Sequence, residues 1–206
     1  MKLIIFGATG SVGRLVVDQA LEQGHHVSAF TRDPAKVTMR HERLAVVGGQ
    51  VTDVDVVAKA VAGHDAVIVT LGAGRKGGVR APGTKAIIDA MHDTGVRRLI
   101  VQSTLGAGDS RVHLTFFWKR IMFGLLLRGA YADHQEQERI VMASDVDWTI
   151  VRPGAFTDGP RTGVYRRGFG QDERSEIKIA RADVADFLLE QLTDTAYLRS
   201  AAAISY

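Results

Sequence analysis

Short apolar runs alternate with amphipathic segments along most of the chain. Residues 3–6, LIIF, are apolar at every position, which is typical of a strand buried on both faces of a parallel sheet. Similar runs predict strands at residues 26–30, 44–47, 66–70, 99–102 and 147–151, and shorter strands at 177–179 and 202–205. The segments between them predict helices at residues 54–61, 84–94, 131–143 and 183–192. This order predicts an α/β fold, a Rossmann-type doubly wound and mostly parallel sheet, as a single domain over residues 1–206.

The turn after the first strand has the sequence GATGSVG, residues 7–13, and an amphipathic helix follows it and ends near Gly24. Gly7 permits a sharp turn, Gly10 lets the backbone approach a pyrophosphate, and Gly13 lets the helix pack on the strand. The positive end of the helix would face the phosphates. The G-x-x-G-x-x-G spacing differs from that of common dehydrogenases, and a glycine turn without a ligand is the alternative. Because strand and helix flank the motif correctly, we predict a dinucleotide cofactor bound by Gly7, Thr9, Gly10, Ser11, Val12 and Gly13.

The second strand is followed by Thr31-Arg32-Asp33-Pro34, at the position where a dinucleotide-binding fold contacts the 2′ group of the cofactor ribose. Enzymes specific for NAD usually place an acidic residue at this strand end, where it accepts from the 2′-hydroxyl group. Arg32 suits a 2′-phosphate better, because a guanidinium can donate paired hydrogen bonds to it. Asp33 comes one residue late and is expected to cap the turn before Pro34. The sequence therefore favours NADP(H) over NAD(H).

Two further loops follow central strands and border the predicted crevice. Residues 71–78 are rich in glycine, but for residues 76–80 we favour a flexible surface loop. Ser103 and Thr104 end the 99–102 strand, where their hydroxyl groups are candidates for contact with a nicotinamide or substrate, as catalytic residues. A simple turn stabilised by these hydroxyl groups is an equal alternative.

The chain has 206 residues, no cysteine and a formal net charge of +3. The absence of cysteine excludes disulfides and thiolate chemistry. The basic side chains are scattered along the sequence and form no basic stripe of the kind that binds nucleic acid. The histidines lack metal-ligand spacing, so no metal site is predicted. We expect a cytoplasmic protein without a signal peptide or stable membrane insertion. The apolar segment 114–127 has three interpretations. We favour a lid over the substrate site or a partner contact, ahead of a buried core helix and of a membrane-surface helix.

Several segments together resemble a known family: GATGSVG, TRDPAK, VIVTLGAG, VQSTLGAG, DWTIVRPGAFTDGPRTGVY and IARADVADFLLEQL. The chain resembles the atypical short-chain dehydrogenases/reductases with an NAD(P)H-binding, NmrA-like domain, and within them the flavin reductase/biliverdin-IXβ reductase group. The resemblance implies that Arg32 holds the 2′-phosphate and that Ser103 and Thr104 lie near the nicotinamide. It also implies cofactor contacts from Gln50, Val51, Leu71, Gly72, Arg75, Pro153, Gly154, Ala155 and Phe156.

The Tyr-x-x-x-Lys pair that is widespread in the superfamily is absent, because Gln135 stands four residues after Tyr131. Asp133-His134 matches the flavin reductase group instead, and we expect His134 to be structural rather than catalytic. Two functions stay open. One is an NADPH-dependent reductase that passes hydride to a flat conjugated acceptor, a flavin, quinone or tetrapyrrole. The other is a non-catalytic NADP(H)-binding sensor or scaffold. The expected partners are a small-molecule acceptor and, at most, a second copy in a homodimer.

Overall fold

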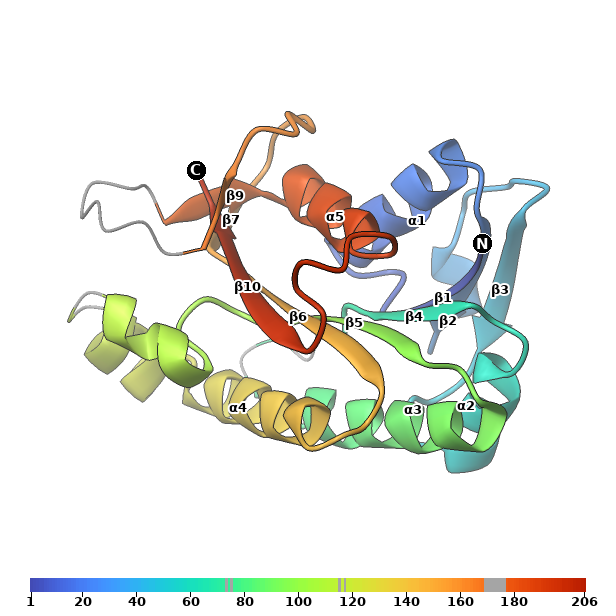
Figure 1. Ribbon diagram of the computed structural model, residues 1–206, viewed down its shortest axis with the longest axis horizontal. Coiled ribbons are helices and arrows are strands. Elements are labelled where there is room, and N and C mark those ends of the chain that lie inside the picture. Colours follow the sequence, from blue (N-terminus) through green and yellow to red (C-terminus); the bar gives the residue numbers. More distant parts are fainter. Residues whose placement is uncertain (73, 75, 115, 117, 169–176) are drawn as a thin grey trace.

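A mostly parallel sheet forms the centre of the fold. In the computed structural model, which describes residues 1–72, 74, 76–114, 116, 118–168 and 177–206, eight strands have the order β3-β2-β1-β4-β5-β6-β10-β8 (Figure 1). β8 is antiparallel to β10, and the other pairs are parallel. The strands are β1 (Lys2–Phe6), β2 (His26–Thr31), β3 (Leu44–Gly48), β4 (Ala66–Val69), β5 (Arg98–Gln102), β6 (Asp147–Pro153), β8 (Arg166–Arg167) and β10 (Ser200–Ser205). β7 (Ala155–Thr157) and β9 (Lys178–Ala180) form a separate parallel pair.

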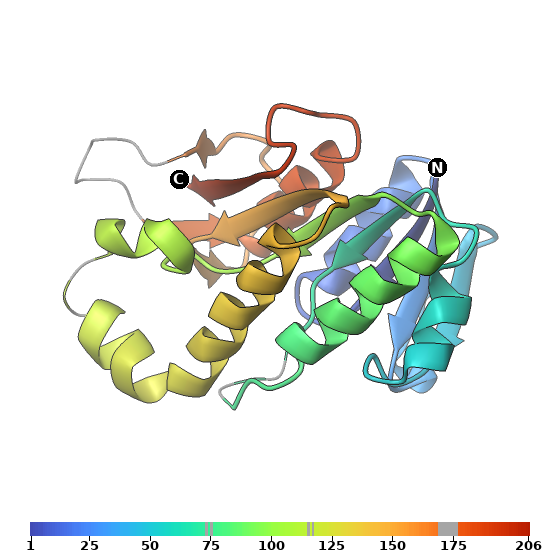
Figure 2. The same ribbon diagram turned by 60° about the horizontal axis from the view of Figure 1, so that its bottom comes forward.

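Helices cover both faces of this sheet. α1 (Gly13–Glu22) and α5 (Arg181–Glu190) lie on one face, and α2 (Val54–Val61), α3 (Arg80–Thr94) and α4 (Arg128–Met142) lie on the other (Figure 1). Figure 2 shows α2, α3 and α4 side by side on their face of the sheet. The predicted α/β, Rossmann-type, doubly wound architecture is therefore confirmed, and the strand order reverses between β1 and β4.

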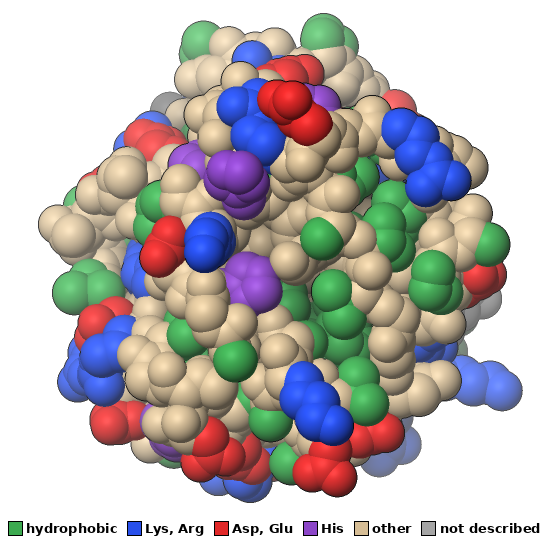
Figure 3. Space-filling model, turned by 90° about the vertical axis from the view of Figure 1, so that its right-hand side faces the viewer, with side chains coloured by type: hydrophobic (Ala, Val, Ile, Leu, Met, Phe, Trp, Pro, Cys, Tyr) green, Lys and Arg blue, Asp and Glu red, His purple; other side chains and the backbone are tan. Residues whose placement is uncertain are grey.

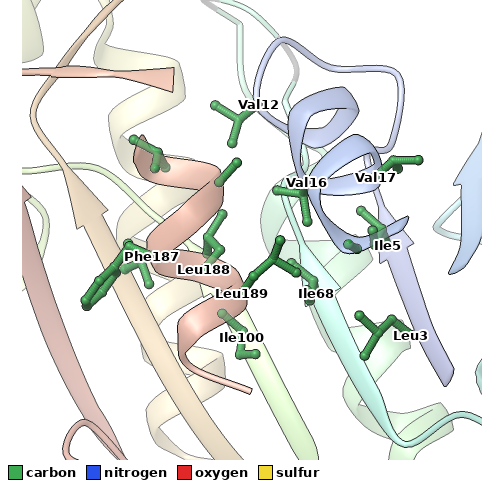
Figure 4. Packing of buried hydrophobic residues seen from close by; sticks show 14 of the residues in the cluster. Leu3, Ile5, Val12, Val16, Val17, Ile68, Ile100, Phe187, Leu188 and Leu189 are labelled. Atoms are coloured by element: carbon green, nitrogen blue, oxygen red, sulfur yellow. The ribbon is translucent and has the colours of Figure 1, made fainter. Parts of the chain in front are cut away.

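The apolar runs that predicted the strands supply the core. Leu3 and Ile5 of β1 point to the face covered by α1 and α5, where they belong to one buried cluster with Val16 and Phe187 (Figure 4). Ile4 and Phe6 point to the opposite face, toward α2 and α3. Burial of alternate side chains on both faces explains why β1 is apolar from residue 3 to residue 6.

Three helices begin earlier than the sequence pattern predicts. α3 begins at Arg80 rather than at residue 84, α4 at Arg128 rather than at residue 131, and α5 at Arg181 rather than at residue 183. α2 begins where predicted, because the Asp53 side chain accepts from the Val56 N–H at 3.2 Å.

The apolar segment 114–127 contains a π-helical stretch, η3 (Trp118–Leu126), which leads into α4. The Leu127 N–H donates to the Met122 carbonyl at 2.7 Å, a bond across five residues. Phe116 and Leu125 are each 74% exposed. In the parts of the chain that the structure describes, no helix has the length and apolar character needed to cross a membrane.

The charged side chains are mixed on the face of the molecule shown in Figure 3. Lys and Arg side chains lie among Asp, Glu and hydrophobic ones there, without a continuous basic stripe.

Candidate functional site

The turn between β1 and α1 has the geometry that its glycines allow. Gly7 has a φ of 85°, and a Cβ there would lie 2.6 Å from the Thr70 carbonyl oxygen. The Gly10 N–H donates to the Gly7 carbonyl at 2.9 Å. Val12 is the N-cap residue of α1, and its side chain makes no capping hydrogen bond. The first N–H groups of α1 thus lack a side-chain cap, which suits an anion at this helix end.

A cavity of about 360 Å³ lies over this turn, and we call it the cofactor cavity. It occupies the carboxyl ends of β1, β2 and β4, where the strand order reverses. Most of the predicted cofactor residues line it: Gly7, Thr9, Gly10, Ser11, Val12, Arg32, Val51, Leu71, Gly72 and Phe156.

Six predicted cofactor residues do not line this cavity or cannot be placed: Gly13, Gln50, Arg75, Pro153, Gly154 and Ala155. Gly13 is buried behind the turn, where a Cβ would lie 2.1 Å from the Gly7 carbonyl oxygen, so its role is in packing. Gln50 is exposed, and its carbonyl accepts from the Asp53 N–H at 3.0 Å in the turn before α2. Val51, and not Gln50, lines the cavity wall, and the contact of Gln50 with the adenine stays a prediction. Arg75 lies outside the described residues.

The wall at the end of β2 carries two cations. Arg32 and Lys36 both line the cofactor cavity. Between them, the Asp33 side chain accepts from the Ala35 N–H at 3.3 Å and caps the short turn η1 (Pro34–Lys36), as predicted. This turn returns the chain so that Lys36 reaches the same wall as Arg32. The Asp33 carboxylate therefore caps the turn and is not directed at the position of a cofactor ribose.

A second cavity, of about 160 Å³, adjoins the first, and we call it the acceptor cavity. Its lining includes the remaining predicted site residues, Ser103, Thr104, Pro153, Gly154, Ala155 and Phe156. Its other walls are largely apolar, with Leu105, Leu114, Phe123, Leu127 and Ile177. Arg80, Gln102 and Phe156 line both cavities, which places the two spaces next to each other.

The two candidate hydroxyl groups differ in their surroundings. Thr104 donates to the Leu105 carbonyl at 3.4 Å, a local bond typical of a turn. Ser103 is 1% exposed, and its hydroxyl group has no hydrogen-bond partner among the described residues. A buried hydroxyl group without a partner is costly, so Ser103 is the better candidate for a ligand contact.

Arg80 corrects an expectation, because residues 76–80 were expected to form a surface loop. Arg80 begins α3, and Asp133 of α4 accepts from the N–H groups of Val79, Arg80 and Ala81 at 3.2, 3.1 and 3.0 Å. Burial raises the pKa of the Asp133 carboxyl group, but these three hydrogen bonds outweigh it and hold the pKa below its ordinary value. Asp133 thus caps α3 from a distant part of the chain and fixes Arg80 at the wall of both cavities.

His134 also lines the acceptor cavity and is 8% exposed. Burial first, and the positive charge of Arg80 second, lower the pKa of His134 to about 3. The imidazole is therefore neutral at physiological pH. Its Nδ1 atom is buried and makes no hydrogen bond within the described residues.

The family follows from a match over most of the chain. A family model described as NAD(P)H-binding matches residues 7–195. The chain belongs to this NAD(P)H-binding family. Among curated relatives, UPF0659 protein YMR090W of Saccharomyces cerevisiae is 30% identical, and the match covers 93% of this chain and 87% of the yeast protein.

Solved structures agree with this membership. ChuY, an anaerobillin reductase from Escherichia coli O157:H7, is 27% identical with a TM-score of 0.82, and the match covers 100% of this chain and 97% of that one. A short-chain dehydrogenase/reductase from Veillonella parvula in complex with NADP has the same TM-score at 19% identity, covering 100% of this chain and 94% of that one. The second likeness shows a shared fold.

The residues of the cofactor cavity fit an NAD(P)H molecule. The glycine turn leaves room beside an uncapped helix end, and the cations Arg32 and Lys36 line the cavity at the end of β2. Sequence reasoning missed Lys36, Arg80 and Gln102 as site residues. Lys36 could have been found from its position in the turn after Arg32. No local sequence pattern marked Arg80, because the contact that fixes its position is with Asp133, 53 residues further along the chain.

Proposed function

We propose that this chain is an NADPH-dependent oxidoreductase that transfers hydride to a flat conjugated acceptor, such as a flavin, quinone or tetrapyrrole. The observation that supports this most directly is the junction of the two cavities. A polar, cationic cavity suited to a dinucleotide meets an apolar cavity at Arg80, Gln102 and Phe156. Apolar walls with few polar groups are typical of sites for flat organic ligands.

The chain's own residues would bind and orient the two reactants. When bound, the reduced nicotinamide supplies the hydride. The glycine turn and α1 would hold the pyrophosphate, and Leu105, Leu114 and Leu127 would exclude water from the acceptor. The free hydroxyl group of Ser103 would donate to the acceptor or to the carboxamide of the cofactor. Positioning of this kind supplies much of the rate when no dedicated proton donor is present.

A preference for NADP(H) over NAD(H) is part of the proposal. Arg32 and Lys36 place two cations at the wall where the adenosine ribose would lie, and no carboxylate lines the cavity among the described residues. A 2′-phosphate gains charge-assisted hydrogen bonds there, whereas a 2′-hydroxyl group gains little.

The likeness to ChuY supports the reductase assignment and includes tetrapyrroles among the candidate acceptors. Its name describes an anaerobillin reductase, and the likeness spans the whole of this chain. The segment 114–127 supports the same reading, because Leu114, Phe123 and Leu127 line the acceptor cavity.

A sensor or scaffold that binds NADP(H) without turnover is the second candidate. Tyr131, the nearest match to the family tyrosine, donates its hydroxyl group to the Gly106 carbonyl at 2.9 Å and accepts from Gln135 at 3.2 Å. It is tied into the structure rather than presented to the acceptor cavity. This observation favours a chain that has lost proton-donor chemistry.

Two leucines of one segment test the reductase proposal. Leu127 lines the acceptor cavity, whereas Leu125 is 74% exposed. Leu127→Ala removes apolar contact worth about 1 kcal/mol, so the KM for the acceptor rises roughly fivefold at unchanged NADPH affinity. Leu125→Ala is the matched control and leaves both quantities unchanged. Equal effects of the two variants on acceptor kinetics would argue against this acceptor site, and tight NADPH binding without turnover of any acceptor would favour the sensor.

A further inference from the structure

Arg80 stands where the two cavities meet. Its side chain is 12% exposed, and it lines both the cofactor cavity and the acceptor cavity. Its Nη2 atom lies 4.0 Å from the position that a Cβ would take at Gly72, on the wall of the cofactor cavity. The guanidinium group therefore borders the place where a bound nicotinamide and a bound acceptor would face each other.

The charge of Arg80 is only partly compensated. Its ion pair with Asp133 is long, at 3.5 Å from Nη1 to Oδ2, and the same carboxylate already accepts from three backbone N–H groups of α3. The Nε atom of Arg80 is buried, with no hydrogen-bond partner in the described part of the chain. A buried cation with a shared, distant partner is stabilised when a further negative charge comes close.

Arg80 is also the source of positive charge in the acceptor cavity. The other described residues of its wall are apolar or neutral, and His134 is neutral because burial and Arg80 itself depress its pKa. The effect of one cation is large in such surroundings, since few polar groups screen it.

We propose that Arg80 is a catalytic residue that stabilises the negative charge which hydride transfer places on the acceptor. This inference rests on the proposed reductase function. The acceptor receives a hydrogen nucleus with two electrons, forms one new bond to it and is reduced, while NADPH is oxidised to NADP⁺. The acceptor then carries one extra negative charge until water donates a proton to it. A fixed guanidinium beside that charge lowers the barrier, because it is in place before the charge develops. Arg80 would thereby supply electrostatic stabilisation that the missing Tyr-x-x-x-Lys pair cannot.

A binding measurement without turnover tests this role. The probe is 8-hydroxyriboflavin, a flavin whose ring ionises with a change in its visible absorption spectrum. It is titrated with pH in the complex of the protein with NADP⁺. The wild-type protein is expected to bind the anionic ring roughly tenfold more tightly than Arg80→Met does, which lowers the pKa of the bound dye by about one unit. Arg80→Lys keeps the charge and should retain part of this shift. Arg111→Met, at an exposed arginine over the Tyr131 ring, is the matched control and should behave as wild type.

Kinetics provide the second readout. Arg80→Met should lower kcat roughly a hundredfold while the dissociation constant of NADPH stays within about twofold. Thermal unfolding checks that the variants fold, and the cap on α3 is kept because it uses backbone N–H groups. Equal pKa values of the bound dye in wild type and Arg80→Met, or no dye binding to wild type, would overturn the proposal. A parallel loss of NADPH affinity would overturn it too and assign Arg80 to the cofactor. Failure of the wild-type protein to turn over any acceptor instead refutes the reductase function and, with it, a catalytic role of Arg80, whereas the dye titration still shows whether Arg80 stabilises an anionic ring in this cavity.

Discussion

Replacement of Arg32 by alanine should separate the two nicotinamide cofactors. Arg32 lines the cofactor cavity beside Thr31, at the end of β2, and Lys36 reaches the same wall. A 2′-phosphate carries close to two negative charges at neutral pH. The variant Arg32→Ala removes the hydrogen-bond donor best suited to that phosphate. NADH carries a neutral 2′-hydroxyl group instead, so its binding should depend much less on Arg32.

The magnitude follows from the exposure of the two cations. A hydrogen bond to a charged group is worth about 1.5–3 kcal/mol, so Arg32→Ala should weaken NADPH binding roughly ten- to a hundredfold. The Lys36 side chain is 69% exposed, and its Nζ atom lies 3.6 Å from Asp33 Oδ2. Solvent and this carboxylate therefore both weaken the attraction of Lys36 for a 2′-phosphate. Lys36→Ala should cost only about two- to fivefold. Both effects should shrink as salt is raised.

Fluorescence titration with NADPH and NADH is the assay for these variants. Arg40→Ala is the matched control, since Arg40 is an exposed arginine that does not line the cofactor cavity. NADH affinity should stay nearly constant in all variants. If Arg32→Ala lost affinity for NADH and NADPH equally, Arg32 would act on a part common to both cofactors, and the assigned NADP(H) preference would be wrong.

Three further changes test the packing and charges around the site. Gly13→Ala should lower the free energy of unfolding in urea by about 3 kcal/mol, because its Cβ would lie 2.1 Å from the Gly7 carbonyl oxygen; an unchanged midpoint would contradict this. Glu138→Gln should cost about 1–3 kcal/mol in the same assay, since it removes the buried one of the two carboxylates paired with Arg152 and leaves only the exposed Asp109, and an unchanged stability would refute the buried pair. Asp133 has a depressed pKa in the folded protein, so it stabilises the fold above its unfolded pKa, and that contribution is lost as pH falls through the folded pKa. The stability difference between wild type and Asp133→Asn should therefore be largest near neutral pH and shrink in acid, and a constant difference would argue against the cap.

The sequence predicted those parts of the fold that depend on local patterns. β1 and its neighbours were predicted because burial on both faces makes most of their residues apolar, and the glycine turn because its geometry needs residues without a Cβ. β8 has two residues, which are both arginines, and β7 has three, so neither was predicted from an apolar pattern.

The parts that were missed depend on contacts between distant residues. The start of α3 was placed too late because its cap is Asp133, which lies in α4, after β5 and η3 in the chain. The same contact explains why Arg80 was assigned to a surface loop. The sequence showed the apolar segment 114–127 but not the acceptor cavity that it helps to form. The walls of this cavity come from β5, η3, α4 and β7, which are far apart in the chain.

Turnover of NADPH in the presence of an acceptor tests the central claim most directly. Purified protein is mixed with NADPH and, in turn, with flavins, quinones and linear tetrapyrroles, and the loss of reduced nicotinamide absorbance is followed. Wild type should consume NADPH with at least one acceptor. Gly10→Val should remain folded and consume none, because its side chain would enter the cofactor cavity where the turn is already tight, with a Cβ 3.1 Å from the Gly7 carbonyl oxygen. Tight NADPH binding by wild type with no turnover of any acceptor would contradict the reductase assignment and leave a cofactor sensor in its place.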